Sequence, residues 1–67
     1  MVTYNEANQC RLLMKMKLFN YSWYDSSEVR SGKDGWTVVI FVKEINKKVK
    51  RYIPKKIKEV SVNIETV

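Results

Sequence analysis

Apolar residues dominate one run of this chain, residues 36–45, where most positions are β-branched or aromatic. Such a run is typical of a β-strand, in which alternate side chains point to opposite faces of a sheet. One face would carry every second residue of the run, namely Trp36, Val38, Ile40 and Val42. Because Val39 and Phe41 on the other face are also apolar, we expect a central strand whose second face is partly covered.

Alternation of apolar and polar residues predicts two further strands. Over residues 11–19, Leu12, Met14, Met16 and Leu18 share one parity and Lys15 and Lys17 take the other, which would give a strand with one apolar face. Over residues 60–65 valine and isoleucine alternate with polar residues, which predicts a final strand with one face open to water.

Two segments after the apolar run complete the expected sheet. Asn46 and Lys47 have the character of a two-residue hairpin turn, so that residues 48–54 would return as a strand that ends at Pro54. Residues 55–58 would then form a crossing turn. In this register Phe41 pairs with Tyr52, and Lys43 pairs with Lys50.

The remaining segments are polar. Thr3 and Glu6 have the spacing of a capping box, which favours a short helix over about residues 4–9, although residues 1–10 could equally form a disordered arm. Residues 25–35 contain both glycines together with several serines and aspartates, and we expect a long loop there.

These elements predict a mainly β fold, or an α+β fold if the N-terminal segment is helical. The expected architecture is a small twisted antiparallel sheet or open barrel of about four strands, in one domain over residues 1–67. Its core would contain Leu12, Met14, Met16, Leu18, Trp36, Val38, Ile40, Val42, Val49, Ile53, Val60, Val62 and Ile64.

Composition removes most kinds of active site. The 67 residues include no histidine and one cysteine, Cys10, so imidazole catalysis, an internal disulfide and a structural zinc site are excluded. We therefore expect no enzyme, catalytic residue, metal or small-molecule cofactor. The longest purely apolar stretch, residues 38–42, is far below the ~18 residues that span a bilayer. A cytoplasmic protein without a membrane partner is the resulting expectation.

Positive charge is concentrated in one part of the chain. The net charge is +6, but residues 43–58, called the basic segment below, hold eight basic residues and one acid, Glu44, which gives +7. The rest of the chain carries −1. The excess positive charge therefore belongs to this segment and not to the chain as a whole, and we expect it to form one basic surface.

Cations beside aromatic rings suit single-stranded nucleic acid, because bases stack on rings while lysines contact phosphates. The predicted hairpin would bring such groups together on one face of the sheet, and Tyr21, Trp23 and Tyr24 could extend the platform. The candidate nucleic-acid-binding residues are Phe41, Lys43, Lys48, Lys50, Tyr52, Lys55 and Lys56.

Three alternatives stay open. Lysines on an outer strand commonly serve solubility and prevent pairing between sheet edges. The basic segment would also suit an acidic protein or a membrane surface. Lastly, the chain could be a structural or protein-interaction protein, a homo-oligomer that buries Val39, Phe41 and Tyr52 of the second sheet face against another subunit.

Overall fold

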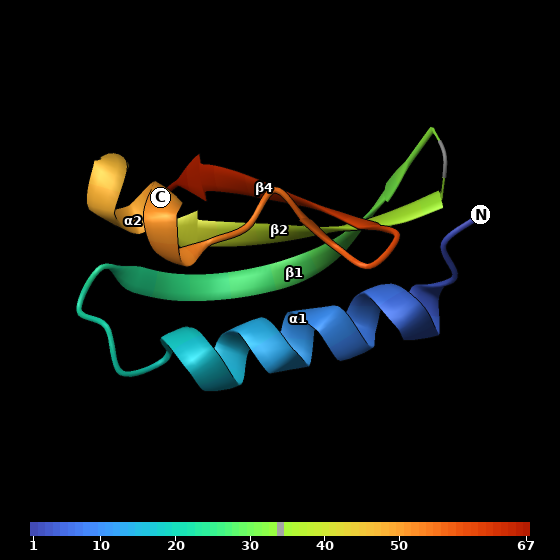
Figure 1. Cartoon of the computed structure of the whole chain (residues 1–67), viewed down its shortest axis with the longest axis horizontal. Coiled ribbons are helices and arrows are strands. Elements are labelled where there is room, and N and C mark those ends of the chain that lie inside the picture. The colour runs from blue at the N-terminus through green and yellow to red at the C-terminus, as the bar shows by residue number, and fades with distance from the viewer. Residues whose placement is uncertain (34) are drawn as a thin grey trace.

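The computed structural model describes residues 1–33 and 35–67, and its elements form one helix against a four-stranded sheet, with a short second helix (Figure 1). In chain order the elements are α1 (Tyr4–Leu18), β1 (Tyr24–Gly32), β2 (Gly35–Val42), α2 (Lys47–Tyr52), β3 (Lys56–Ile57) and β4 (Val60–Thr66). The α+β alternative is confirmed, and the sheet is not closed into a barrel.

Helix α1 begins at the predicted capping box. The backbone N–H of Glu6 donates to Thr3 Oγ1 at 3.2 Å, and the N–H of Thr3 donates to Glu6 Oε1 at 3.1 Å. The hydrogen bond that the Glu6 carboxyl accepts from the backbone of Thr3, followed in size of effect by the one with the Thr3 side chain, holds the pKa of this carboxyl below its ordinary value. Two backbone donors that a helix start would leave unpaired are satisfied in this way, which favours the start of a helix at this point.

The helix continues to Leu18, so the prediction of a strand over residues 11–19 is wrong. Leucine, methionine and lysine all favour helices, and the cap supplies a start. Residues two apart lie about 200° apart around a helix, so Met14 and Met16 point in opposite directions. Met14 is 2% exposed and Met16 is 71% exposed. Leu12, at 43% exposed, also lies outside the core that we expected it to join.

The predicted loop over residues 25–35 is mostly strand. β1 pairs with β2 in antiparallel register from Tyr24 opposite Val42 to Gly32 opposite Gly35. Asp34, which belongs to the expected loop, lies outside the described residues. A segment rich in serine and charge forms a strand because pairing with β2 overrides its weak intrinsic preference, and as an edge strand it can stay polar.

The predicted hairpin after β2 is replaced by a helix. Asn46 caps α2, since its side-chain Oδ1 accepts the N–H of Val49 at 2.9 Å. The predicted strand over residues 48–54 and its cross-strand pairs therefore do not form. Asparagine is among the best helix-capping residues, and the helix ends shortly before Pro54, which disfavours helical geometry in the residue that precedes it.

This helix changes the topology of the sheet. The strand order is β1-β2-β4-β3, with β2 and β4 parallel and the other neighbours antiparallel. Parallel neighbours need a crossover connection, which residues 43–59 provide with α2 and β3. The strands predicted over residues 36–45 and 60–65 correspond to β2 and β4, but the expected all-antiparallel sheet is mixed.

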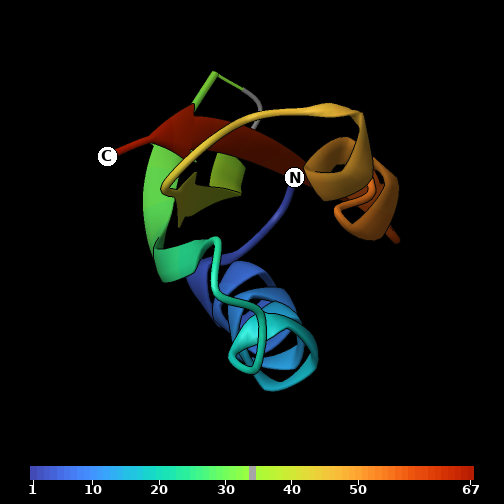
Figure 2. The ribbon, with the colours of Figure 1, turned by 90° about the vertical axis from the view of Figure 1, so that its left-hand side faces the viewer.

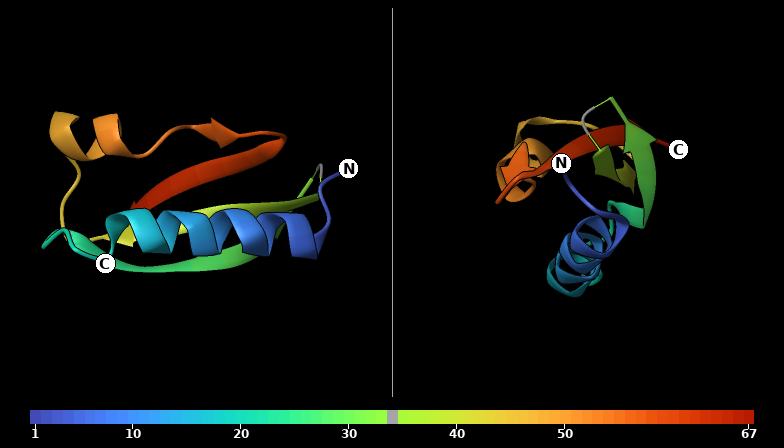
Figure 3. Two further views of the ribbon diagram at one scale, coloured as in Figure 1. Left: turned by 60° about the horizontal axis from the view of Figure 1, so that its bottom comes forward. Right: turned by 90° about the vertical axis from the view of Figure 1, so that its right-hand side faces the viewer.

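One face of the sheet holds the core. Helix α1 lies lengthwise along this face against β1 and β2, as Figure 3 shows, and it contributes Ala7, Cys10, Met14 and Leu18. Val49 and Ile53, from α2 and the residue after it, join the same cluster. The strands contribute Val38, Ile40, Val42, Val60 and Val62, while Trp36 and Ile64 are only partly buried.

The opposite face of the sheet is polar, with Val39 buried within it. The guanidinium of Arg30 on β1 contacts Glu65 on β4 at 2.6 Å, so the ion pair crosses the intervening strand near Val39. The hydrogen bond to Glu65, and to a smaller extent the one to Glu28, raises the pKa of Arg30. Val39 is 1% exposed. This face is therefore not the open apolar surface that the oligomer hypothesis required.

Candidate nucleic-acid interface

Helix α2 presents its cations to solvent. Val49 is its one buried residue, and Lys47, Lys48, Lys50 and Arg51 are all exposed around it. The helix is short, and burial of Val49 in the core together with the Asn46 cap holds it in place. Four positive charges on six residues repel one another, which an anionic ligand would relieve.

Three aromatic rings stack beside these cations, and we call Tyr21, Trp23 and Tyr52 the aromatic stack. The Tyr21 ring lies 5.0 Å from that of Trp23 at an interplanar angle of 12°. On α2, Tyr52 lies 4.9 Å from Tyr21 and 6.3 Å from Trp23, tilted by 34° and 26°. Tyr52 is 43% exposed and Trp23 only 8%, so the stack runs from the core to the surface.

Trp23 anchors the stack to the sheet. Its carbonyl accepts the N–H of Lys43 at 2.8 Å, which joins the start of β1 to the residue after β2. The indole Nε1 of Trp23 is buried and has no hydrogen-bond partner among the described residues.

The structure brings together some of the predicted binding residues and separates others. Lys48, Lys50 and Tyr52 all lie on α2, where Lys48 shares the side of Tyr52 and Lys50 lies about 200° round the helix from both. The backbone N–H of Lys43 bonds to the carbonyl of Trp23 in the aromatic stack. Lys55 and Lys56 come after the helix, at the start of the short strand β3, and both are exposed.

Phe41 belongs to a different surface. It lies opposite Glu65 in the register of β2 with β4, on the polar face of the sheet, and it is half-buried. The predicted pair of Phe41 with Tyr52 depended on a hairpin that does not exist. Val39, Phe41 and Tyr52 consequently do not form one face, and the surface proposed for a homo-oligomer is absent in that form.

Sequence reasoning found part of the aromatic stack. Tyr21 and Trp23 were expected to extend the platform, and they supply two of its three rings. Tyr24 does not join the ring contacts among the described residues, and its hydroxyl donates to Ser27 Oγ at 3.2 Å. Lys47 and Arg51 were missed as members of the interface, and both lie exposed on α2 with Tyr52.

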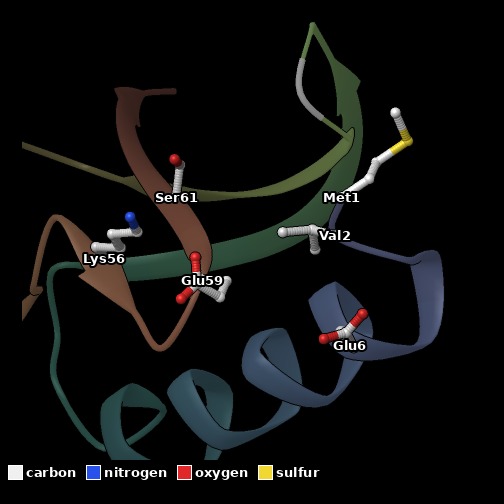
Figure 4. A pocket seen from close by; sticks show the side chains of 6 residues that line it. All are labelled: Met1, Val2, Glu6, Lys56, Glu59 and Ser61. Carbon is white, nitrogen blue, oxygen red and sulfur yellow. The ribbon is translucent and has the colours of Figure 1, made fainter.

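An open pocket of about 670 Å³, which has Lys56 in common with the predicted binding residues, lies between the N-terminal residues, α1 and the β3–β4 turn (Figure 4). Its lining is Met1, Val2, Glu6, Lys56, Glu59 and Ser61. The charges are mixed, and the Glu6 carboxylate is already engaged by Thr3. The pocket therefore lacks the concentration of like charge and aromatic surface found at α2.

The part of the chain that the structure describes holds no cluster of three or more metal-ligating side chains. Within the same residues, neither helix combines the length and the apolar character needed to cross a bilayer. Comparisons with protein-family models, with curated proteins and with solved structures find no match for this chain. The function is therefore argued from the physical properties of the α2 surface.

Proposed function

We propose that this protein is a small, non-enzymatic binding module for single-stranded nucleic acid. Its contact surface is α2 with the neighbouring lysines of the basic segment, and Tyr52 is the residue on which a base stacks. The observation that carries the proposal is the position of an exposed ring, itself stacked on Tyr21, on a helix whose other exposed residues are cationic.

The aromatic stack supports this role through its rigidity. An isolated surface tyrosine loses rotamer freedom when a base packs on it, which weakens the gain from stacking. Tyr52 is already held by Tyr21 and Trp23, so less freedom remains to be lost. Stacking of a base on an aromatic side chain contributes about 1–3 kcal/mol and tolerates any base. The surface therefore favours unpaired bases without selecting a sequence.

The lysines would supply affinity through phosphate contacts. Binding to single strands weakens with salt in proportion to the number of phosphates neutralised, with a logarithmic slope of about −0.7 for each. Contacts from Lys48, Lys55 and Lys56 would give a slope of roughly −2. Double-stranded nucleic acid keeps its bases stacked internally, so Tyr52 would add little to its binding.

Fluorescence anisotropy of a labelled mixed-sequence oligonucleotide tests the proposal. We expect binding at low salt that falls steeply as salt is added, and weaker binding of the matching duplex. Tyr52→Ala should weaken single-strand binding about 5- to 100-fold. Tyr52→Phe, the matched control, keeps the ring and should bind as the parent does.

A second pair of variants tests the cations. Lys48→Glu with Lys50→Glu should abolish binding, since both side chains are exposed and the reversal changes the local charge by four. Lys15→Gln with Lys17→Gln on α1 removes charge outside the proposed interface and should leave binding nearly unchanged. Absence of oligonucleotide binding at low salt, or equal binding by the Lys48 and Lys50 variant, would refute the proposal.

A further inference from the structure

Helix α1 has a second apolar face, which points away from the sheet. The buried residues of the helix lie on one side, and Leu12, Leu13, Met16 and Phe19 lie on the other, called the outer face of α1 below. These four side chains are 43%, 49%, 71% and 61% exposed. Figure 2 shows α1 nearly end-on, with one side toward the sheet and its outer side open.

Such exposure is unusual for a small monomer. Single exposed apolar side chains are common, but four on two adjoining helical turns form a contiguous patch, and patches of this kind generally mark a binding surface. None of the four takes part in the core cluster. Their apolar side chains therefore serve no packing purpose within the described part of the chain.

The charges that α1 itself places beside this face are positive, while Glu59 lines a pocket with Leu13 and Asp25 lines one with Arg11 and Lys15. Arg11, Lys15 and Lys17 flank the outer face, and residues 7–24 contain no aspartate or glutamate. Glu6, the one acid of the helix, is held in the capping box at its other end. A symmetric contact with a second copy would bring these like charges together, whereas an anionic surface would be attracted to them.

We infer that the outer face of α1 docks on an anionic lipid bilayer surface. Leucine, methionine and phenylalanine on one side of a helix, flanked by lysine and arginine, have the chemistry of helices that lie in the membrane interface. A bilayer accepts a convex ridge without a matching groove. The apolar seam, in contrast, extends over only two turns, too short for a coiled coil with an acidic partner helix.

This inference replaces the expectation of no membrane partner. That expectation came from the lack of a spanning segment, but a helix that lies on a bilayer immerses one face by only about 5–10 Å and needs no such segment. The inference also uses side chains that the proposed nucleic-acid surface does not include, so the two can fail independently.

Flotation with vesicles of phosphatidylcholine, with and without phosphatidylserine, tests the inference on the full chain. We expect binding only when phosphatidylserine is present. Met16→Ser with Phe19→Ser should weaken binding at least about tenfold, because the apolar contacts are lost. Both side chains are largely exposed, so the fold should be retained, as circular dichroism would check. Lys15→Gln with Lys17→Gln should weaken binding at least about fivefold.

Lys48→Gln with Lys50→Gln is the matched control, because it removes the same charge from the proposed nucleic-acid surface. It should keep most of the vesicle binding. Failure to bind phosphatidylserine vesicles overturns the inference. So does binding that depends on Lys48 and Lys50 but not on Met16 and Phe19, which would indicate attraction through the basic segment alone. Sedimentation showing a dimer that Met16→Ser with Phe19→Ser dissociates would instead assign this face to a second copy.

Discussion

At the scale of single residues, Gly35 decides how the N-terminal segment meets the sheet. Its φ is +118°, a conformation that side chains of L-residues rarely adopt. A Cβ at this position would lie 2.6 Å from the carbonyl oxygen of Val2. That carbonyl accepts the N–H of Trp36 at 3.2 Å, and Val2 forms a parallel bridge with Gly35. The close approach of the two backbones therefore requires glycine.

Gly35→Ala should destabilise the protein by about 1–3 kcal/mol, through backbone strain and through separation of Val2 from β2. Urea unfolding followed by circular dichroism measures the change. Gly32→Ala is the matched control in the paired position of β1, where a Cβ would come no closer than 3.3 Å to its neighbours. Equal effects of the two substitutions would contradict this account of Gly35.

At the scale of elements, α1 shows why a period of two can be misleading. Leucines and methionines lie on both sides of this helix. Those at even positions from 12 to 18 alternate as in a strand, whereas the buried residues 7, 10, 14 and 18 have the spacing of a helix. The capping box was the local signal that favoured the helix. The prediction failed because Leu12, Leu13, Met16 and Phe19 lie on the outer face of α1 and contribute nothing to the core.

Met14 and Met16 provide a direct comparison, because they share a face in a strand and oppose each other in a helix. Met14→Ala should cost about 2–5 kcal/mol of unfolding free energy, since the side chain is almost completely buried. Met16→Ala should change stability by less than about 0.5 kcal/mol. Chemical denaturation of the two variants gives the comparison, and similar losses for both would indicate that Met16 is covered in solution.

In α2, too, the residues were assigned to a strand although they form a helix, and this affects the candidate site. The sequence placed Lys48, Lys50 and Tyr52 correctly in one basic segment, yet the strand register assigned Tyr52 to the wrong aromatic partner. A lysine-rich stretch with a single buried valine contains almost no periodic signal. Asn46 suits both a hairpin turn and a helix cap. It acts as a cap here because β2 and β4 are parallel, and parallel strands need a longer crossover connection than a hairpin turn.

At the scale of the whole molecule, charge works against folding. The protein measures 32 × 20 × 19 Å, and most of its excess charge sits on the basic segment, which runs from α2 to Lys56 and Lys58 beside the start of α1. In ~0.01 M salt the screening length of ~30 Å is comparable to the longest dimension, whereas in ~0.15 M salt it is ~8 Å. Repulsion among the lysines therefore acts across the molecule only at low ionic strength.

The melting temperature should consequently rise by about 1–5 °C between these two salt concentrations, because screening weakens the like-charge pairs of α2. Thermal unfolding followed by circular dichroism in sodium chloride would show it. Lys48→Glu should reduce the rise by removing like-charge contacts. A melting temperature that falls with added salt would mean that attractive ion pairs, such as Arg30 with Glu65, outweigh the repulsion.

Local sequence signals are sufficient for the features that depend on neighbouring residues. These are the central strand β2, the final strand β4, the cap at Thr3 and Glu6, and the location of the positive charge. Each follows from side-chain size, branching or hydrogen bonding within a few positions. The exclusion of imidazole chemistry likewise needs only the composition.

Long-range packing accounts for the features that depend on partners far along the chain. A polar segment became β1 because β2 offers its edge, and β2 and β4 became parallel because α2 crosses between them. The aromatic stack is assembled from residues 21, 23 and 52, which no local pattern connects. Only packing could show which apolar side chains of α1 enter the core, because burial depends on what surrounds a residue and not on the residue alone.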